Sequence, residues 1–98
     1  KELLAELIKL QSSKFNLTIH ARGIGLMAGL DLRREGGAPA TEESLRVIKA
    51  LLRRGFIFLP EGEHGNVISV TPPLTITETQ LRATTKALSE ELEKVARP

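Results

Sequence analysis

Three segments of the chain carry apolar residues at intervals of three or four positions, which is the period of an α-helix. They predict a helix over residues 2–11, a second from Thr41 to just before Gly55, and a third that begins at Thr77. Polar residues fill the other positions, so each helix is expected to bury one face. The three apolar faces are Leu3, Leu7 and Leu10; Leu45, Ile48, Leu51 and Leu52; and Leu81, Leu88, Leu92 and Val95.

Extended chain is predicted between the first two helices, over residues 17–32. From Ile24 to Leu32 every even position is apolar, and this alternation places one set of side chains on a covered sheet face. The odd positions include Gly23, Gly25, Gly29 and Asp31. Glycines on the second face indicate that a neighbour packs close there, or that the strand bends.

Two shorter apolar runs predict strands over residues 56–59 and 67–71. The segment 60–66 between them is a polar turn with two glycines. A connection of this length favours an antiparallel hairpin.

Local signals mark where two of the helices begin. Thr41 is a favourable N-cap, and two glutamates follow it at the positive end of the helix. Residues 77–80 match the capping box, in which a threonine and a glutamine satisfy each other's backbone N–H groups. Near the end of the same helix, Glu90 and Lys94 are spaced for an ion pair.

The predicted order is helix, strand, helix, strand, strand, helix. It indicates an α+β fold with a small, largely antiparallel three-stranded sheet and helices packed on one face. Residues 1–98 are expected to form a single domain, with a leading helix over 1–11 and an α+β sandwich over 17–98.

Composition narrows the function classes. The formal charge of +2, with three Phe and no Trp or Tyr, gives little for nucleic-acid bases to stack on. No apolar run is long enough to cross a bilayer, and the absence of cysteine excludes disulfides and thiolate metal sites. We therefore expect a cytoplasmic protein that binds neither nucleic acid nor membrane. The opening Lys1, with no initiator Met, predicts a fragment of a larger chain.

No self-contained active site emerges from the remaining motifs. Residues 23–28 fit a loose dinucleotide pattern, but alternating strand continues where a helix should open. His20 and His64 lie far apart without metal-ligand spacing, and Glu61 and Glu63 are expected in a solvated turn. Catalytic, cofactor-binding and metal-binding residues are therefore expected to be absent.

Ser69 and Thr71 occupy alternate positions of one predicted strand, so they face the same side of the sheet. No His–Asp pair is placed to activate either hydroxyl as a nucleophile. From the residues alone they form a polar outer sheet face.

Two stretches resemble the C-terminal small domain of class-III pyridoxal-phosphate-dependent aminotransferases, the ornithine and 4-aminobutyrate aminotransferase family. Residues 21–32 read Ala-Arg-Gly-Ile-Gly-Leu-Met-Ala-Gly-Leu-Asp-Leu. The second stretch, residues 59–77, begins with Leu-Pro and ends with Asn-Val-Ile-Ser-Val-Thr-Pro-Pro-Leu-Thr-Ile-Thr. Both are similar to family segments in order and spacing, and helices are predicted between them.

The resemblance implies a fold-type-I enzyme, generally a homodimer, whose small domain closes one side of the substrate pocket. In this family a separate large domain carries the lysine that binds pyridoxal phosphate, and the protein tunes the cofactor's chemistry. None of the six lysines here lies in a context like the family's Schiff-base motif. We therefore expect the cofactor in the parent enzyme, whereas the fragment alone should neither hold it nor catalyse amino-group transfer.

The resemblance also makes Ser69 and Thr71 substrate-pocket candidates. Ornithine and 4-aminobutyrate aminotransferases have at the position of Ser69 an arginine that grips a substrate carboxylate. A guanidinium binds a carboxylate bidentately, and a hydroxyl cannot. Our hypothesis is that the parent enzyme takes a substrate without a carboxylate there, or holds that carboxylate from elsewhere.

Other functions stay open at this point. A decarboxylase, a racemase or a phospho-lyase of the same family would carry the same domain. A free-standing, non-catalytic α+β interaction module would also lack an active site. The sequence that precedes Lys1 in the gene would discriminate best, because only an enzyme of this family would show a large domain with a Schiff-base lysine.

Overall fold

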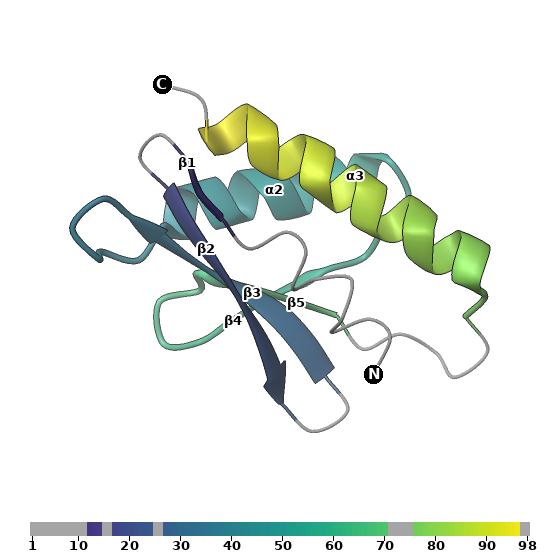
Figure 1. Cartoon of the computed structure of the whole chain (residues 1–98), viewed down its shortest axis with the longest axis horizontal. Helices are drawn as coiled ribbons and strands as arrows, with labels where there is room; N and C mark the ends of the chain where they lie inside the picture. Colours follow the sequence, from purple (N-terminus) through teal and green to yellow (C-terminus); the bar gives the residue numbers. More distant parts are fainter. Residues whose placement is uncertain (1–11, 15–16, 25–26, 71–75, 97–98) are drawn as a thin grey trace.

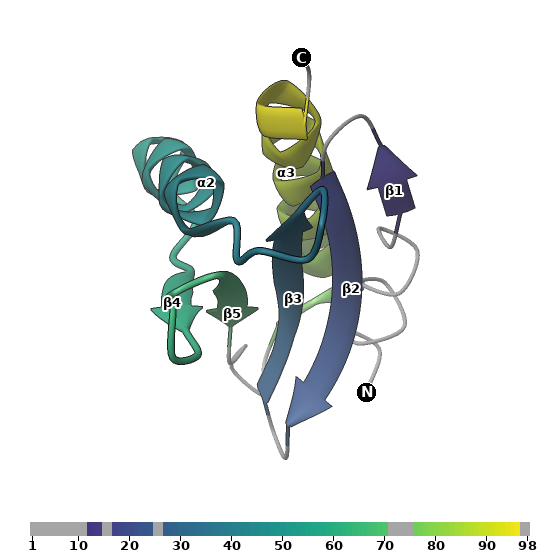
Figure 2. The ribbon, with the colours of Figure 1, turned by 90° about the vertical axis from the view of Figure 1, so that its left-hand side faces the viewer.

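A computed structural model describes residues 12–14, 17–24, 27–70 and 76–96 of the chain (Figure 1). A layer of strands carries two helices, which both lie on the same face of the sheet in Figures 1 and 2. The predicted α+β class, with helices on one face, is therefore confirmed. The elements in chain order are β1 (Ser12–Lys14), β2 (Leu17–Ile24), β3 (Met27–Arg34), α2 (Thr41–Arg53), β4 (Leu59–Glu61), β5 (Val67–Val70) and α3 (Glu78–Ala96).

Among the described residues the sheet has five strands in the order β1-β2-β3-β5-β4, and every neighbouring pair is antiparallel. The prediction of three strands was wrong. Residues 17–32 do not form one strand, because β2 and β3 pair with each other from Leu17↔Arg34 to Ile24↔Met27. The apolar alternation from Ile24 onward continues across the point between β2 and β3 where the chain reverses direction. A period of two residues therefore does not show that there are two strands.

The predicted hairpin of two short strands is confirmed as the antiparallel pair β4–β5. Its first strand lies three residues later than predicted, at Leu59–Glu61. Residues 56–58 instead lead from α2 to the sheet, and Phe58 is buried in the core. Pro60 is accommodated in β4 because this strand is an edge of the sheet, where one missing donor is tolerated.

The hydrophobic core lies between the helices and one face of the sheet. Register pairs place Ile19 beside Leu32, and Leu30 beside Ile68, on this inner face. Leucines of both helices cover them. The larger core side chains are Leu17, Ile19, Leu30, Leu32 and Ile68 from the sheet, Val47, Ile48 and Leu51 from α2, Leu81, Leu88 and Leu92 from α3, and Phe58.

The buried face of α2 differs from the predicted one. Leu45 is 39% exposed and Leu52 is 59% exposed, whereas Val47 and Ser44 are fully buried. The helix is therefore rotated so that Ser44, whose hydroxyl donates to the Ala40 carbonyl at 2.8 Å, faces the sheet. A period that counts only apolar residues could not assign a buried serine to the core.

Thr41 is not the N-cap of α2. Ala40 takes that position without a side-chain hydrogen bond, and Thr41 is the first helical residue. Its hydroxyl donates instead to the carbonyl of His64, at 2.6 Å.

The capping box of α3 is confirmed. The backbone N–H of Thr77 donates to Oε1 of Gln80 at 2.9 Å, and the Gln80 N–H donates to Oγ1 of Thr77 at 3.1 Å. Leu81, Leu88 and Leu92 are buried, as their spacing predicted.

Some predictions fall outside the described residues, namely the helix over 2–11 and the position of Thr71. Neither of the described helices is long and apolar enough to cross a membrane.

Candidate functional site

The sheet has a second face, turned away from the helices, which we call the outer face. Since Leu30 and Ile68 are paired and point into the core, their neighbours point to the outer face. Gly29 is paired there with Ser69, and Ser69 with Leu59. Two residues before Ser69 on the same face of β5, Val67 is paired with Asp31 of β3 on one side and with Glu61 of β4 on the other.

Ser69 lies on the outer face of β5, between β3 and the edge strand β4, and is 3% exposed. Its hydroxyl donates to the backbone carbonyl of Leu59, 3.3 Å away across the β4–β5 pair. Leu59 itself is 55% exposed. The Ser69 side chain is therefore uncharged, and its hydroxyl proton is already used in the hydrogen bond to Leu59.

Gly29 lies in register with Ser69, where a side chain would not fit. A Cβ at this position would lie 2.9 Å from the carbonyl oxygen of Ile68 and 3.1 Å from Cγ1 of Val67. The sequence left open whether a neighbour packs on the glycine-bearing face or the strand bends. At Gly29 the close neighbour is the backbone of β5, the adjacent strand of the same sheet.

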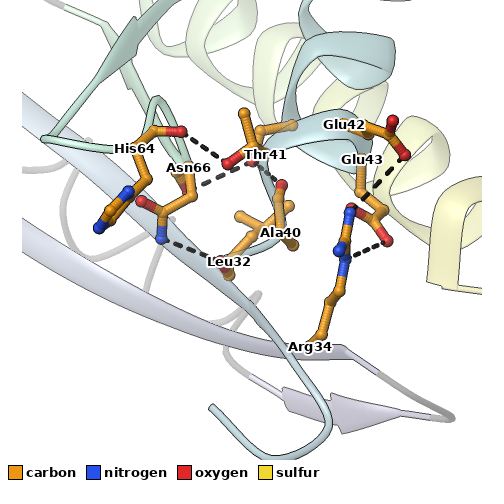
Figure 3. A network of polar contacts seen from close by, with 9 residues as sticks. Leu32, Arg34, Ala40, Thr41, Glu42, Glu43, His64 and Asn66 are labelled. Atoms are coloured by element: carbon orange, nitrogen blue, oxygen red, sulfur yellow. Dashed lines mark hydrogen bonds and ion pairs between the residues drawn. The ribbon is translucent and has the colours of Figure 1, made fainter. Parts of the chain in front are cut away.

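Asn66, directly before β5, joins this strand to β3 (Figure 3). It is 3% exposed, and its side-chain N–H₂ donates to the Leu32 carbonyl at 3.0 Å, as Figure 3 shows. The same N–H₂ group also donates to Oδ1 of Asp31, at 2.8 Å. The Leu32 N–H donates in return to the Asn66 carbonyl, at 3.0 Å. These bonds fix the start of β5 against β3.

The same network reaches α2. The Ala40 N–H donates to the Leu32 carbonyl at 2.9 Å, and the bond from Thr41 to His64 ties the first turn of α2 to the β4–β5 turn (Figure 3). Sequence reasoning passed over Asn66. Its position before an apolar strand was the available signal, but its partners are 34 and 35 positions away.

An ion pair also connects the end of β3 to α2. Arg34 at the end of β3 donates from Nε to both carboxylate oxygens of Glu43, at 3.2 and 3.1 Å (Figure 3). Burial raises the pKa of Glu43, but the hydrogen bonds and charge of Arg34 outweigh it, and the net shift of that pKa is downward. The pair anchors α2 to the sheet in its charged form.

The structure does not bring the other sequence candidates together. His20 lies on β2, His64 lies in the β4–β5 turn, and Glu61 and Glu63 are exposed, as expected of a solvated turn. Within the described ranges no three His, Cys, Asp or Glu side chains are placed to hold a metal ion. A dinucleotide site at residues 23–28 also lacks its helix, because β3 continues there.

The lysines whose side chains are described do not fit a covalent pyridoxal-phosphate site. Lys49 lies on α2, and Lys86 and Lys94 lie on α3. Both helices are on the opposite face of the sheet from Ser69, and Lys94 contacts Glu91 at 3.3 Å.

Comparisons with known proteins give relatives of one enzyme family, although no family model matches the chain. An alanine/serine racemase from Pyrococcus horikoshii is 32% identical over 77 residues, which are 79% of this chain and 16% of the racemase. The alanine–glyoxylate aminotransferase 2 homolog 2 of Arabidopsis thaliana is 31% identical over 97 residues, 97% of this chain and 20% of that protein. An ethanolamine-phosphate phospho-lyase homolog of Caenorhabditis elegans is 30% identical over 74 residues, 72% of this chain and 16% of that protein.

Solved structures agree with these relatives. A transaminase from the marine bacterium Virgibacillus superposes with a TM-score of 0.78 at 26% identity, over 96% of this chain and 22% of that one. The chain thus spans about a fifth of the length of the proteins it matches. By its sequence and its fold, the chain matches a C-terminal fragment of the class-III, pyridoxal-phosphate-dependent aminotransferases, as its sequence predicted.

Proposed function

We propose that this domain closes one side of the substrate pocket in a pyridoxal-phosphate-dependent aminotransferase, a homodimer of the cytoplasm, which moves an amino group between an amine or amino acid and a 2-oxo acid. A large domain of the same protein holds the cofactor. The observation that carries this proposal is the two-sided sheet: helices of the described residues cover one face, while Ser69 and Gly29 lie on the other.

The described residues around Ser69 suit a neutral substrate group. The hydroxyl is engaged with the Leu59 carbonyl, Gly29 adds no side chain, and Leu59 is apolar. In register with Val67, two residues before Ser69 on β5, are the carboxylates Asp31 and Glu61. Asp31 is paired with the Arg33 guanidinium at 3.2 Å, so Glu61 is the carboxylate that disfavours a second anion nearby. The parent enzyme is therefore proposed to take amines whose distal end carries no carboxylate at this position.

The test is Ser69→Arg in the full-length protein, assayed with two probes that differ in one group. 4-Aminobutyrate carries a distal carboxylate, and n-butylamine does not. Because charge-assisted hydrogen bonds contribute about 1.5–3 kcal/mol, we expect the ratio of kcat/KM for 4-aminobutyrate over n-butylamine to rise about tenfold or more. Ser89→Arg, at an exposed position of α3, is the matched control and should leave the ratio unchanged. An unchanged ratio in Ser69→Arg would show that position 69 does not face the pocket.

A second candidate function is supported by two of the relatives, a racemase and a phospho-lyase homolog, which match the same domain. In this alternative the parent enzyme keeps the cofactor and the pocket wall but catalyses racemisation, decarboxylation or elimination. Product analysis of the full-length protein with L-alanine and 2-oxoglutarate separates two of the cases. Pyruvate and glutamate indicate amino transfer, and D-alanine without pyruvate indicates racemisation. A non-catalytic interaction module gains no support from relatives that are all named as enzymes.

A further inference from the structure

We propose that Gly29 is a positioning residue for position 69: by lacking a side chain it lets β5 lie against β3, and this sets where residue 69 stands in the pocket wall. The inference rests on the proposed function, because it assumes that Ser69 faces the substrate.

The contact that requires glycine is made by backbone. A Cβ on residue 29 would lie 2.9 Å from the Ile68 carbonyl oxygen, which cannot rotate aside as a side chain could. Ordinary contact needs several tenths of an ångström more, so β5 must move. The Cα of Ser69 lies 3.5 Å from the same point, and Ser69 follows Ile68 directly in the strand. Ser69 therefore moves with the carbonyl that is displaced.

The start of β5 cannot take up this movement. Asn66 is bonded to β3 through its side chain and its carbonyl, and its side chain is buried. On the far side, β4 pairs with β5 from Leu59↔Ser69 to Glu61↔Val67. With residue 66 fixed, the displacement caused by a methyl group at residue 29 falls on residues 67–70.

The requirement at Gly29 is one of space and not of backbone conformation. Gly29 lies inside β3 and is not among the glycines with positive φ. Gly36 offers the opposite case, because its φ is +92° and a Cβ there would meet nothing within 4 Å. Gly36→Ala thus strains the chain without touching β5, which makes it a matched control.

The test combines these variants with Ser69→Arg in the full-length protein, using 4-aminobutyrate and n-butylamine. A displacement of 1 Å can cost about a hundredfold in rate, so a shift of several tenths should cost about threefold to tenfold. We expect Gly29→Ala/Ser69→Arg to lose at least about threefold of the selectivity ratio gained by Ser69→Arg, and Gly36→Ala/Ser69→Arg to keep it. A general loss of stability lowers both activities and leaves their ratio unchanged.

Amide chemical shifts or hydrogen exchange over residues 66–70 provide an independent readout. They should change in Gly29→Ala and not in Gly36→Ala; equal changes would overturn the geometry. A changed β5 with a full selectivity gain would overturn the positioning role. No gain in Ser69→Arg itself would instead refute the proposed function. Should Gly29→Ala be too unstable to purify, Gly29→Ala/Val67→Ala allows the same comparison, because it removes the methyl group 3.1 Å from the new Cβ.

Discussion

Asn66 shows how much one residue contributes to the architecture. Its side chain donates to an acceptor of the Asp31 side chain and to the backbone of Leu32, and its own carbonyl accepts from Leu32. Ser44 of α2 also lies 3.3 Å from that carbonyl. The start of β5, the neighbouring strand β3 and helix α2 are therefore joined at one residue, through its side-chain amide and its backbone carbonyl.

Asn66→Ala should lower the free energy of unfolding by about 2 kcal/mol, because it removes two hydrogen bonds in a buried setting. Urea denaturation of the chain measures the effect. His64→Ala, two residues earlier with an exposed side chain, should change the stability by less than about 0.5 kcal/mol, because the Thr41 bond uses only the His64 backbone. Equal losses in the two variants would contradict the role given to the Asn66 amide.

Residue-level contacts could be predicted from the sequence where both partners are close in the chain. The capping box of Thr77 and Gln80 spans three positions, so its residue types alone announce it. Thr41 carries the same capping signal, but its hydroxyl bonds to a carbonyl 23 positions away. The local preference of Thr41 for capping the helix gave way to a tertiary hydrogen bond with the His64 carbonyl, and no sequence pattern specifies that partner. Ser69 was identified as a candidate, but its burial and its bond to Leu59 needed the fold.

At the level of elements, the two helices are joined by charges as well as by the core. Arg54, which follows α2, donates to Glu90 at 2.8 Å and to Glu91 at 2.9 Å on α3. Lys94 also contacts Glu91, at 3.3 Å, and not Glu90 as its spacing predicted. The Glu91 side chain is only 7% exposed, so its carboxylate is shielded from solvent, whereas the Arg54 side chain is 38% exposed.

The pKa of Glu91 provides a pH-dependent test of this joint. The hydrogen bond from Arg54 lowers the pKa, burial opposes it, and Lys94 lowers it further, so that the net shift is downward. A carboxyl whose pKa is lower in the folded chain stabilises above its unfolded value of about 4.3, and this stabilisation is lost as the pH falls through the folded value.

Glu91→Gln should therefore reduce the free energy of unfolding by about 1 kcal/mol at pH 7, and the difference from the unchanged chain should vanish in acid. Denaturation curves at several pH values between 7 and 3 measure this. Glu93→Gln, at an exposed position of α3, is the control and should cost less than about 0.5 kcal/mol. A difference between Glu91→Gln and the unchanged chain that persists at low pH would contradict a charge-based joint.

Elements with strong periodicity could be predicted, and their pairing could not. The helix of residues 78–96 and the β4–β5 hairpin follow from period and turn composition. The β2–β3 hairpin was missed because apolar alternation continues across it, and register is a property of two strands at once. The rotation of α2 was missed because Ser44 replaces an apolar residue on its buried face.

On the scale of the whole molecule, the described residues form a two-layer structure of one sheet and two helices. The described helices and the inner sheet face form the core, and the outer face carries neutral groups, the carboxylates of Asp31 and Glu61, and Arg33, which is paired with Asp31 at 3.2 Å. The α+β class could be predicted from the sequence, because its caps and apolar faces mark the elements. The absence of a self-contained active site stays a prediction. The partner domain could be named only through family resemblance, because no residue pattern within the chain describes it.

The chain alone should therefore bind pyridoxal phosphate only as scattered surface adducts. After the two are mixed, the absorbance in the visible range should depend on no single lysine. Mass spectrometry after borohydride reduction should find low labelling spread over several lysines, Lys49, Lys86 and Lys94 among them. An unrelated protein with as many exposed lysines is the control. Stoichiometric labelling of one lysine would show that this chain holds a cofactor site of its own.

Pro60 also bears on how the domain behaves when many copies are present. It stands in the middle of β4, whose three residues are all exposed at one edge of the sheet. A strand from another molecule that aligned along this edge would find no N–H at its centre to complete a ladder. The opposite edge, β1, is also only three residues long. Neither edge of the described sheet is a good template for further strands, so the domain is protected from edge-to-edge aggregation while it is made and before other surfaces cover it.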